Sequence, residues 1–371
     1  MPLDRRKLLP LCLCLTALAA APSAARAAVT WIIQGHGFGH GVGMSQYGAY
    51  GYARHGRGYR FILGHYYGGT TIGTLGSSPV VRVLLEQARG DIGFSGATAA
   101  CGKALSPTRD YQVHPVGSTL QLRTSGGRGL ADCGGELRAG GTGSVRVTGL
   151  GVYAGSLVIS PSDGGGVNVV NAVGVDQYVK GVIANESPPS WPMAELRAQA
   201  VASRSFALSG QVGGAGFDLY SDTRSQVYRG VESQTARTDL AANSTRGQVV
   251  IYRGRIAETF FSACSGGHTE SVQNVFGGPP IPYLVGVPDP YDYYCPLQNW
   301  TLRFSGPAIS AKLGAYLKGL LRRVLVTQHG VSPRIVWARL YGTGGVTRVS
   351  GEQLEIALGA YSTWMSFRRV G

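Results

Sequence analysis

The segment from Val175 to Leu208 reads VDQYVKGVIANESPPSWPMAELRAQAVASRSFAL, and the rest of the chain can be interpreted around it. Apolar residues at helical spacing predict a first helix that ends near Asn185. The prolines of residues 186–192 cannot continue this helix, because proline lacks an amide donor and restricts the residue before it. A second helix is expected from about Pro192 to Leu208, and its face of small residues allows a partner to pack closely.

Glu186 lies at the junction between these two helices. A carboxyl group held in a rigid loop can be partly desolvated, which disfavours its ionised form and raises its pKa. Such a group can donate a proton near neutral pH, as glycoside cleavage requires at the leaving oxygen. The alternative interpretation is a loop glutamate that interacts with the N-terminus of the next helix.

A hydrolytic glycosidase usually needs a second carboxylate. The candidates in the sequence are Asp218, Asp222 and Glu232, and Asp222 belongs to an expected polar strand, 221–228. Taken alone, these three acids fit structural roles better than catalytic ones.

Glycine occupies every second position from Gly35 to Gly43. If this stretch is extended, one face carries no side chains, and His36 and His40 share the other face about 13 Å apart. That separation is too large for one metal ion, so we interpret both histidines as substrate-binding groups, with a structural role as the alternative. Ser45 is expected to cap a short helix that Gly56 ends, and a further helix is expected over residues 59–66.

The complete pattern predicts an α+β fold, in which a mixed helical core with antiparallel strands carries a β-rich subdomain. We expect four parts: a signal peptide over 1–27, a Gly/His-rich block over 28–78, the β-rich subdomain over 79–172, and a catalytic core over 173–371. Within the core we also expect a helix over 233–243 and a hairpin of 248–252 with 255–261. Farther on, the expected elements are a helix over 309–321, strands over 334–349 and a short helix after Ser350.

The N-terminal residues have the order of a secretory signal peptide. A charged start at residues 5–7 precedes a short apolar run, and Ala25-Arg26-Ala27 is a small-x-small cleavage site. The predicted location is therefore outside the cytoplasm, in the periplasm, cell wall or medium. No later segment has the length and apolar character of a transmembrane helix.

The formal net charge of +14 suits an anionic partner outside the membrane, such as a wall glycan or a phosphate-rich wall polymer. Nucleic acid is not an expected partner, because the sequence has no finger, RNP-like motif or dense basic stripe. The sequence also lacks a Walker loop, a dinucleotide-binding pattern, a Gly-x-Ser-x-Gly elbow and a His-Glu-x-x-His motif. These absences argue against nucleotide enzymes, dehydrogenases and the usual serine or zinc hydrolases.

Four cysteines remain once the expected signal is removed, and in an exported protein an even number favours disulfides. Neighbour pairing would join Cys101 to Cys133 and Cys264 to Cys295. The alternative for Cys264 is a zinc site with His268, to which the histidines near the N-terminus could contribute, since zinc takes three or four protein ligands. We favour the disulfide over the metal and expect no required cofactor.

Five motifs in order resemble one known family, the stage II sporulation protein D and amidase-enhancer (SpoIID/LytB) family. The first motif is the Asn185–Pro192 segment followed by Leu196–Ser205, both quoted above. The other four are Asp222-Thr223 with Gln226-Val227-Tyr228, the Phe261–Glu270 block, the Tyr283–Asp289 block, and Gly39–Ala49, which reads GHGVGMSQYGA.

One feature departs from the family pattern. The His-Gly-Val-Gly-Met-Ser-Gln block usually comes last, whereas here it comes first, so the chain resembles a circular permutation of the family. Permutation is tolerated where the original termini lie close together. We therefore expect residues 28–78 to dock beside the C-terminal segment and to complete the site around Glu186.

The resemblance implies a lytic transglycosylase that acts on peptidoglycan, with Glu186 as acid and then base. It also implies that no second carboxylate is needed, because the C6 hydroxyl of the substrate attacks in place of water. The same blocks imply substrate contacts from Ser45, Gln46, Arg204, Asp222, Gln226 and Tyr228, in addition to His36 and His40. A binding protein that stimulates a wall amidase is the alternative that the enhancer branch implies, and a zinc-dependent wall hydrolase is the third.

Overall fold

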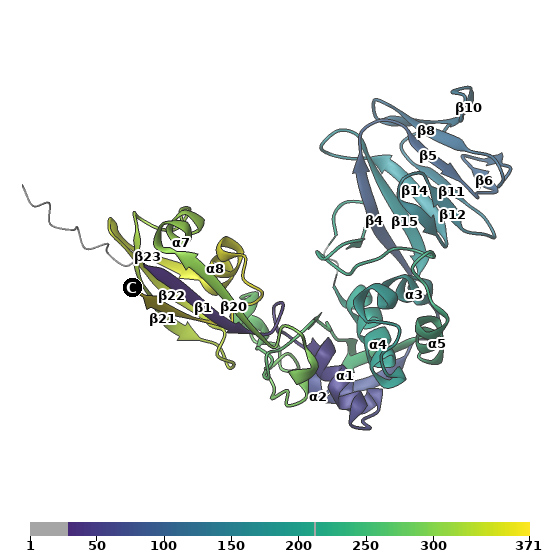
Figure 1. Cartoon of the computed structure of the whole chain (residues 1–371). Helices are drawn as coiled ribbons and strands as arrows, with labels where there is room; N and C mark the ends of the chain where they lie inside the picture. Colours follow the sequence, from purple (N-terminus) through teal and green to yellow (C-terminus); the bar gives the residue numbers. More distant parts are fainter. Residues whose placement is uncertain (1–28, 211–212) are drawn as a thin grey trace, which may run out of the picture.

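The computed structural model describes residues 29–210 and 213–371, in which helices and several sheets confirm the predicted α+β class. Figure 1 shows three parts: a β domain, a helical core, and a C-terminal module on the other side of the core. The expected signal peptide of residues 1–27 lies outside the described residues. Among the residues described, no helix has the length and apolar character needed to cross a membrane.

The β domain pairs two antiparallel-rich sheets around one apolar core. The six-stranded sheet has the order β10-β9-β8-β5-β12-β13, and the seven-stranded sheet has the order β16-β4-β15-β14-β11-β6-β7. The strands are β4 (Val80–Ala88), β5 (Ile92–Ser95), β6 (Ala99–Ala100), β7 (Lys103–Ala104), β8 (Tyr111–Val116), β9 (Thr119–Thr124), β10 (Gly129–Asp132), β11 (Leu137–Gly140), β12 (Val145–Val147), β13 (Gly151–Tyr153), β14 (Ser156–Pro161), β15 (Val167–Gly174) and β16 (Leu219–Tyr220).

The period-two alternation of the sequence produces this domain. In β8 and β9, for example, Val113, Leu120 and Leu122 are fully buried while their chain neighbours are more exposed. The Cys101–Cys133 disulfide, predicted from neighbour pairing, joins the residue after β6 to the residue after β10. It therefore links the two sheets to each other.

The helical core is built around α4 (Met193–Ser209), which is buried over most of its length. Four helices pack on it or beside it: α1 (Gln46–Arg54), α2 (Tyr59–Tyr66), α3 (Val175–Glu186) and α5 (Ala236–Ser244). Small residues such as Ala198, Ala200 and Ala202 have no exposed surface, which is consistent with the predicted close packing. The core is completed by β2 (Met44–Ser45), β3 (Thr71–Thr74), β17 (Gln248–Tyr252), β18 (Arg255–Ile256), β19 (Phe261–Ser262), α6 (Val272–Val275) and the 3-10 turn η1 (Asp292–Tyr294).

The C-terminal module contains two three-stranded sheets and two helices. In the first sheet, β1 (Thr30–His36) lies between β20 (Asn299–Ser305) and β24 (Met365–Val370), antiparallel to both. The second sheet has the order β21 (Leu321–His329), β22 (Ile335–Gly342), β23 (Gly345–Ser350), and the helices are α7 (Gly306–Lys312) and α8 (Gly351–Leu358). The start of the described chain therefore docks beside the C-terminal segment, as the permutation hypothesis requires.

The structure corrects the expected strand over residues 35–43. Gly37, Gly39, Gly41 and Gly43 all have positive φ, between 71° and 90°, so the chain leaves β1 at His36 and winds through a loop. Glycine adopts this backbone region without the steric penalty that other residues meet. Alternate glycines here permit left-handed turns rather than a strand with one bare face.

Three other boundaries differ from the predictions. The helix expected over 309–321 is the shorter α7, and β21 begins at Leu321. The hairpin at 248–261 has only a two-residue second strand, β18. Residues 221–228 form a loop instead of a strand, because Ser225 N donates to the carbonyl of Asp222 and closes a turn.

Candidate functional site

A cleft of about 430 Å³ opens beside the junction of α3 and the proline segment. Glu186 is the only carboxylate among its described lining residues, which are Phe38, Gly39, His40, Gln46, Glu186, Phe206, Thr223, Arg224, Ser225, Val227, Phe260, Phe261, Ser262, Ala263 and Phe276. Three larger hollows, two of about 620 Å³ and one of about 510 Å³, lie on the β domain and on the C-terminal module, but none of them is lined by a buried acid. The cleft at Glu186 is therefore the candidate site.

Glu186 is the last residue of α3 and is half-buried. The helix ends there because Ser187 adopts an extended conformation ahead of Pro188 and Pro189. The Oε1 atom of Glu186 accepts a hydrogen bond of 2.8 Å from the backbone N–H of Val227. The side-chain amide of Gln46 donates to the Glu186 carbonyl at 3.0 Å and to Oε2 at 3.4 Å.

Burial raises the pKa of Glu186, while the hydrogen bonds from Val227 and Gln46 oppose that shift by favouring the carboxylate. These opposing effects suit a group that has to exist in both protonation states. The raised pKa is the direction predicted for a carboxyl group that is partly desolvated at the helix–proline junction.

The N-terminal block reaches Glu186 through α1. Ser45 is the N-cap of this helix, and its Oγ accepts a hydrogen bond from Gly48 N. Gln46, the next residue, is the one that contacts Glu186. Of the two block residues implied as substrate contacts, Gln46 lines the cleft, whereas Ser45 is buried and holds the helix start in place.

The two histidines of the block lie in different surroundings, contrary to the shared strand face expected from the sequence. His40 lines the cleft between Phe260 and Phe276, whose ring centroids lie 6.1 and 5.3 Å from its own. His36 instead packs its ring against Trp364 and is absent from the cleft lining. The positive-φ glycines between them separate the two side chains.

His40 is held neutral at physiological pH. Burial first, and the positive charge of Arg334 second, lower the pKa of His40 to about 4. Its Nδ1 accepts a hydrogen bond from the backbone N–H of Val42 at 3.0 Å, so the proton of the neutral ring resides on Nε2. His40 therefore carries no charge in the cleft, and the backbone of Phe261 is a further hydrogen-bond partner of its ring.

Three residues implied as substrate contacts turn out to be buried supports. The guanidinium of Arg204 is fully buried, and its Nε donates to Asp176 at 2.9 Å. Tyr228 is 2% exposed and donates to Asn171, and Gln226 is 1% exposed and accepts from Tyr178. The sequence could not reveal this, because a buried ion pair and an exposed ligand contact require the same residue types.

The acids considered as a second carboxylate also lie outside the cleft lining. Asp222 pairs with Arg224, Asp218 pairs with Arg82, and Glu232 pairs with Arg146. Arg224, which the sequence reasoning did not single out, lines the cleft in place of Asp222.

Cys264 is bonded to Cys295, which confirms the predicted disulfide. This thiolate is therefore not available to zinc, and the metal site suggested for Cys264 with His268 is corrected. His268 instead makes a hydrogen bond through Nδ1 to the carbonyl of Thr269. Over the described ranges, 29–210 and 213–371, no group of three or more His, Cys, Asp or Glu side chains could hold a metal ion.

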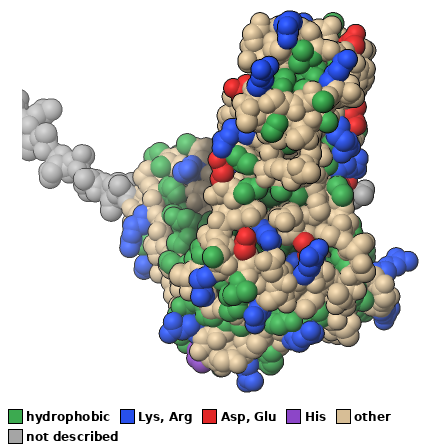
Figure 2. All heavy atoms as spheres, turned by 90° about the vertical axis from the view of Figure 1, so that its right-hand side faces the viewer, with side chains coloured by type: hydrophobic (Ala, Val, Ile, Leu, Met, Phe, Trp, Pro, Cys, Tyr) green, Lys and Arg blue, Asp and Glu red, His purple; other side chains and the backbone are tan. Residues whose placement is uncertain are grey.

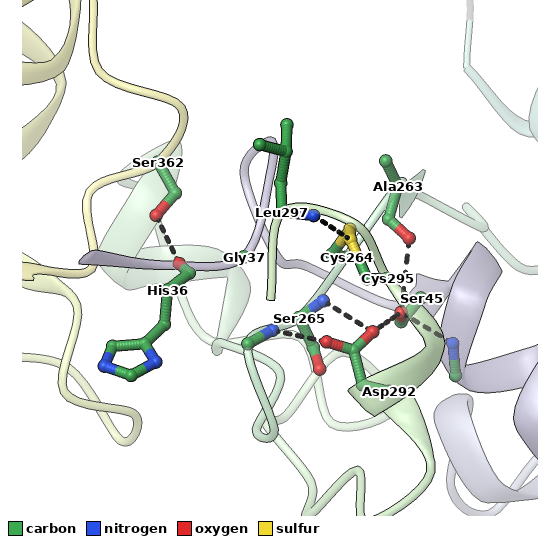
Figure 3. Close-up of a disulfide and its surroundings, with 12 residues drawn as sticks. His36, Gly37, Ser45, Ala263, Cys264, Ser265, Asp292, Cys295, Leu297 and Ser362 are labelled. Atoms are coloured by element: carbon green, nitrogen blue, oxygen red, sulfur yellow. Dashed lines mark hydrogen bonds between the residues drawn. A yellow bond between two sulfur atoms is a disulfide. The ribbon is translucent and has the colours of Figure 1, made fainter. Parts of the chain in front are cut away.

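The disulfide lies beside a buried carboxylate that contacts α1. Figure 3 shows Asp292 between the loop of Cys264 and Ser45. Its Oδ1 accepts from the Ser45 hydroxyl at 2.7 Å, and its Oδ2 accepts from Gly266 N at 2.8 Å. Asp292 was missed by sequence reasoning, although its position three residues before Cys295 was a usable signal.

The aromatic lining of the cleft was also missed. Phe38 and Phe276 are 45% and 52% exposed, and Phe260, a further lining residue, stacks at a tilt on Phe276 with ring centroids 4.9 Å apart. The residues are far apart in the sequence, so no local pattern joins them. The backbone N–H of Val227 is likewise invisible to an argument from side-chain types.

Comparison with known proteins agrees with the resemblance. Residues 163–252 match the family model described as Stage II sporulation protein. An uncharacterized protein of Brachyspira hyodysenteriae is 42% identical over 138 residues, covering 36% of this chain and 37% of that protein. Over 134 residues the chain is 34% identical to the amidase enhancer of Bacillus subtilis, covering 36% of this chain and 18% of that protein.

Stage II sporulation protein D of Bacillus subtilis is 26% identical over 219 residues, covering 54% of this chain and 62% of that protein. The chain thus matches between 18% and 62% of the length of these relatives.

Proposed function

On the premise that this chain belongs to the SpoIID/LytB family, we propose that it is an exported lytic transglycosylase of peptidoglycan. The observation that carries the proposal is the half-buried Glu186, with a raised pKa, as the only carboxylate among the described residues that line an aromatic cleft. Export follows from the predicted signal peptide, and the substrate class follows from the family relationship.

In this reaction protonated Glu186 donates its proton to the glycosidic oxygen, and the bond from that oxygen to C1 of the sugar breaks. The resulting carboxylate then takes the proton of the C6 hydroxyl of the same sugar, whose oxygen bonds to C1. The products are a free hydroxyl on one side and a 1,6-anhydro ring on the other, and Glu186 ends protonated. The scheme consumes no water and uses no metal ion or second carboxylate, so we propose that no cofactor is required.

The neighbours of Glu186 have distinct tasks in this scheme. Val227 N–H and the Gln46 amide stabilise the carboxylate after it has released its proton. The neutral His40 adds an uncharged ring to the cleft wall. Phe38 and Phe276 offer exposed rings to the apolar faces of the sugars.

The test compares Glu186→Gln with the parent protein on purified glycan strands, with mass analysis of 1,6-anhydro ends. Loss of a general acid is expected to lower the rate by about 10²–10⁴-fold, while binding of the strands persists. Glu232→Gln, which removes an exposed acid paired with Arg146, is the matched control and should leave the rate unchanged. Unchanged formation of anhydro ends by Glu186→Gln would refute the assignment.

A second function is favoured by the relative named amidase enhancer. In this reading the cleft binds glycan and the chain stimulates a wall amidase without cutting. The same variant separates the two, because Glu186→Gln would then retain full stimulation of the amidase and the parent would release no anhydro ends.

A further inference from the structure

Positive charge is concentrated in the C-terminal module. Between Asp292 and Glu352 the sequence contains no acidic residue, and it carries eight cationic ones: Arg303, Lys312, Lys318, Arg322, Arg323, Arg334, Arg339 and Arg348. On the face formed by the β domain and the helical core, Figure 2 shows Asp and Glu among Lys and Arg over the upper and middle parts, and Lys and Arg without visible acids over the lower part. Seven of these eight cations are exposed and Arg334 is buried, so the surface of residues 293–351 carries charge of one sign, whereas mixed charges are the norm on protein surfaces.

Three of these arginines lie on the outer face of the sheet β21-β22-β23. The inner face packs on the module core through Ala338, Leu340 and Val349, none of which is exposed. Because side chains alternate along a strand, the outer face carries Arg339 on β22 and Arg348 on β23, both exposed.

Arg339 and Arg348 lie directly opposite each other in the antiparallel register. Like charges in this position destabilise a sheet, because the two side chains are neighbours across the strands. Of the carboxylates described, none lies within 4.0 Å of Arg323, Arg339 or Arg348, whereas seven other ion pairs form on the described chain. The fold thus keeps a repulsive pair that its own residues do not neutralise.

Aromatic rings hold two of the guanidinium groups against the sheet. The Cζ atom of Arg348 lies 3.8 Å from the ring centroid of Trp337, and that of Arg323 lies 5.6 Å from the ring centroid of Tyr341. Such stacking restrains a long side chain and leaves its N–H groups free to donate. The face is therefore a pre-organised set of donors for oxyanions.

We propose that the outer face of β21-β22-β23 binds a phosphodiester polyanion of the cell envelope. A tetrahedral phosphate can accept from two guanidinium forks at once, which fits two arginines that face each other across neighbouring strands. Three strands spaced about 4.8 Å apart form a narrow surface, which suits a polymer strand better than a planar bilayer. Val346, 50% exposed, is the only large hydrophobic residue of this sheet among those described as strongly exposed, so membrane insertion has little support.

This surface lies in the module across the helical core from the β domain, and its residues do not line the Glu186 cleft (Figure 1). It would tether the chain to an anionic polymer while the cleft engages a glycan strand. The inference uses the envelope location of the proposed function, but it needs no cleavage activity.

The experiment measures binding of poly(glycerol phosphate) to the full-length mature chain by calorimetry over a range of salt concentrations. Arg339→Gln with Arg348→Gln is expected to weaken binding at least tenfold and to flatten the salt dependence, because fewer counterions are released. Arg138→Gln with Arg146→Gln is the matched control, since it removes two exposed arginines that pair with Glu136 and Glu232 on other parts of the surface. The control should bind like the parent.

Folding of the variants is checked by thermal unfolding, and Arg339→Gln alone serves as the second variant because it leaves the stack of Arg348 on Trp337 intact. This single change should weaken polymer binding with no loss of thermal stability, since it removes a repulsive pair. Glu186→Gln should bind the polymer normally, which separates failure of this inference from failure of the proposed function.

Three results would overturn the inference. The first is a loss of polymer binding in the control pair as large as that in Arg339→Gln with Arg348→Gln. The second is an affinity for polygalacturonate, whose charges are carboxylates, equal to that for poly(glycerol phosphate). The third is tighter binding to phosphatidylglycerol vesicles than to the polymer. The second result would identify an uronate-like glycan as the partner, and the third would identify the membrane surface.

Discussion

Removing each disulfide in turn should separate its effect on stability from its effect on the site. The two bridges close loops of nearly equal length, with separations of 31 residues for Cys264–Cys295 and 32 for Cys101–Cys133. The chain-entropy relation then gives about 3.7 kcal/mol of stabilisation for either bridge. Replacing both cysteines by alanine in each pair should therefore lower the free energy of unfolding by similar amounts.

The effect on the site should differ, because only Cys264–Cys295 is connected to α1. The bridge fixes the loop at Ser265 and Gly266 against Asp292, and Asp292 accepts from Ser45, the N-cap of α1. Gln46 follows Ser45 and donates to Glu186. A hydrogen bond to a charged group contributes about 1.5–3 kcal/mol, so losing it should lower kcat/KM about tenfold or more.

Two assays read out this difference. Hydrogen exchange of the α1 amides should accelerate in Cys264→Ala with Cys295→Ala and stay as in the parent in Cys101→Ala with Cys133→Ala. Formation of 1,6-anhydro ends should fall in the first pair well beyond the second, under conditions where both remain folded. Equal changes in α1 exchange for the two pairs, or none in either, would refute the connection through Asp292.

Two further predictions concern the buried acids and the aromatic cleft. Burial, together with the nearby Asp292, raises the pKa of Asp289 from 3.8 to about 7; because this folded-state pKa is above the unfolded one, its stabilisation is present below pH ~4 and is lost as pH rises to about 7. Asp289→Asn should remove that part of the pH dependence, as measured by the free energy of unfolding from denaturant titrations at pH 4 and pH 8. The same change in this free energy between the two pH values in parent and variant would contradict the prediction. Phe276→Ala should raise KM for glycan strands about three- to tenfold, as expected for an aromatic contact of 0.5–1.5 kcal/mol, with kcat little changed. Phe61→Ala, which truncates a 45% exposed ring outside the cleft lining, is its control, and a matching rise in KM for both would exclude sugar stacking at Phe276.

Elements with strong local signals could be predicted from the sequence. The helix over 59–66 has the predicted bounds, and α4 begins one residue after Pro192, because periodicity and proline act locally. The glycine-rich block was wrong as a strand, since alternating glycines are equally compatible with alternating positive φ. β21 was missed because only its first residue, Leu321, fell within an expected element, and residues 322–329 were assigned to none.

In the candidate site, too, residues with a local sequence signal could be predicted and residues placed by tertiary contacts could not. Glu186 could be selected because two prolines after a helix are a local signal, and its catalytic role stays a prediction. The contact from Gln46 joins residues 140 positions apart, so it followed only from the family resemblance and the docking hypothesis. Arg204 and Tyr228 were misplaced because burial depends on the tertiary packing of α4 and the β domain, which no local pattern specifies.

The position of β1 between β20 and β24 has a consequence for the order of assembly. The indole of Trp300 on β20 donates to the carbonyl of Gly37, 263 residues earlier, and β24 comes later still. The strand that leads into the His40 loop and α1 therefore cannot find either neighbour until nearly the whole chain has emerged. A chain truncated before β24 would leave one edge of β1 open, while the β domain could already be folded. Such an order places the docking of the His40 loop and α1 among the last steps of folding.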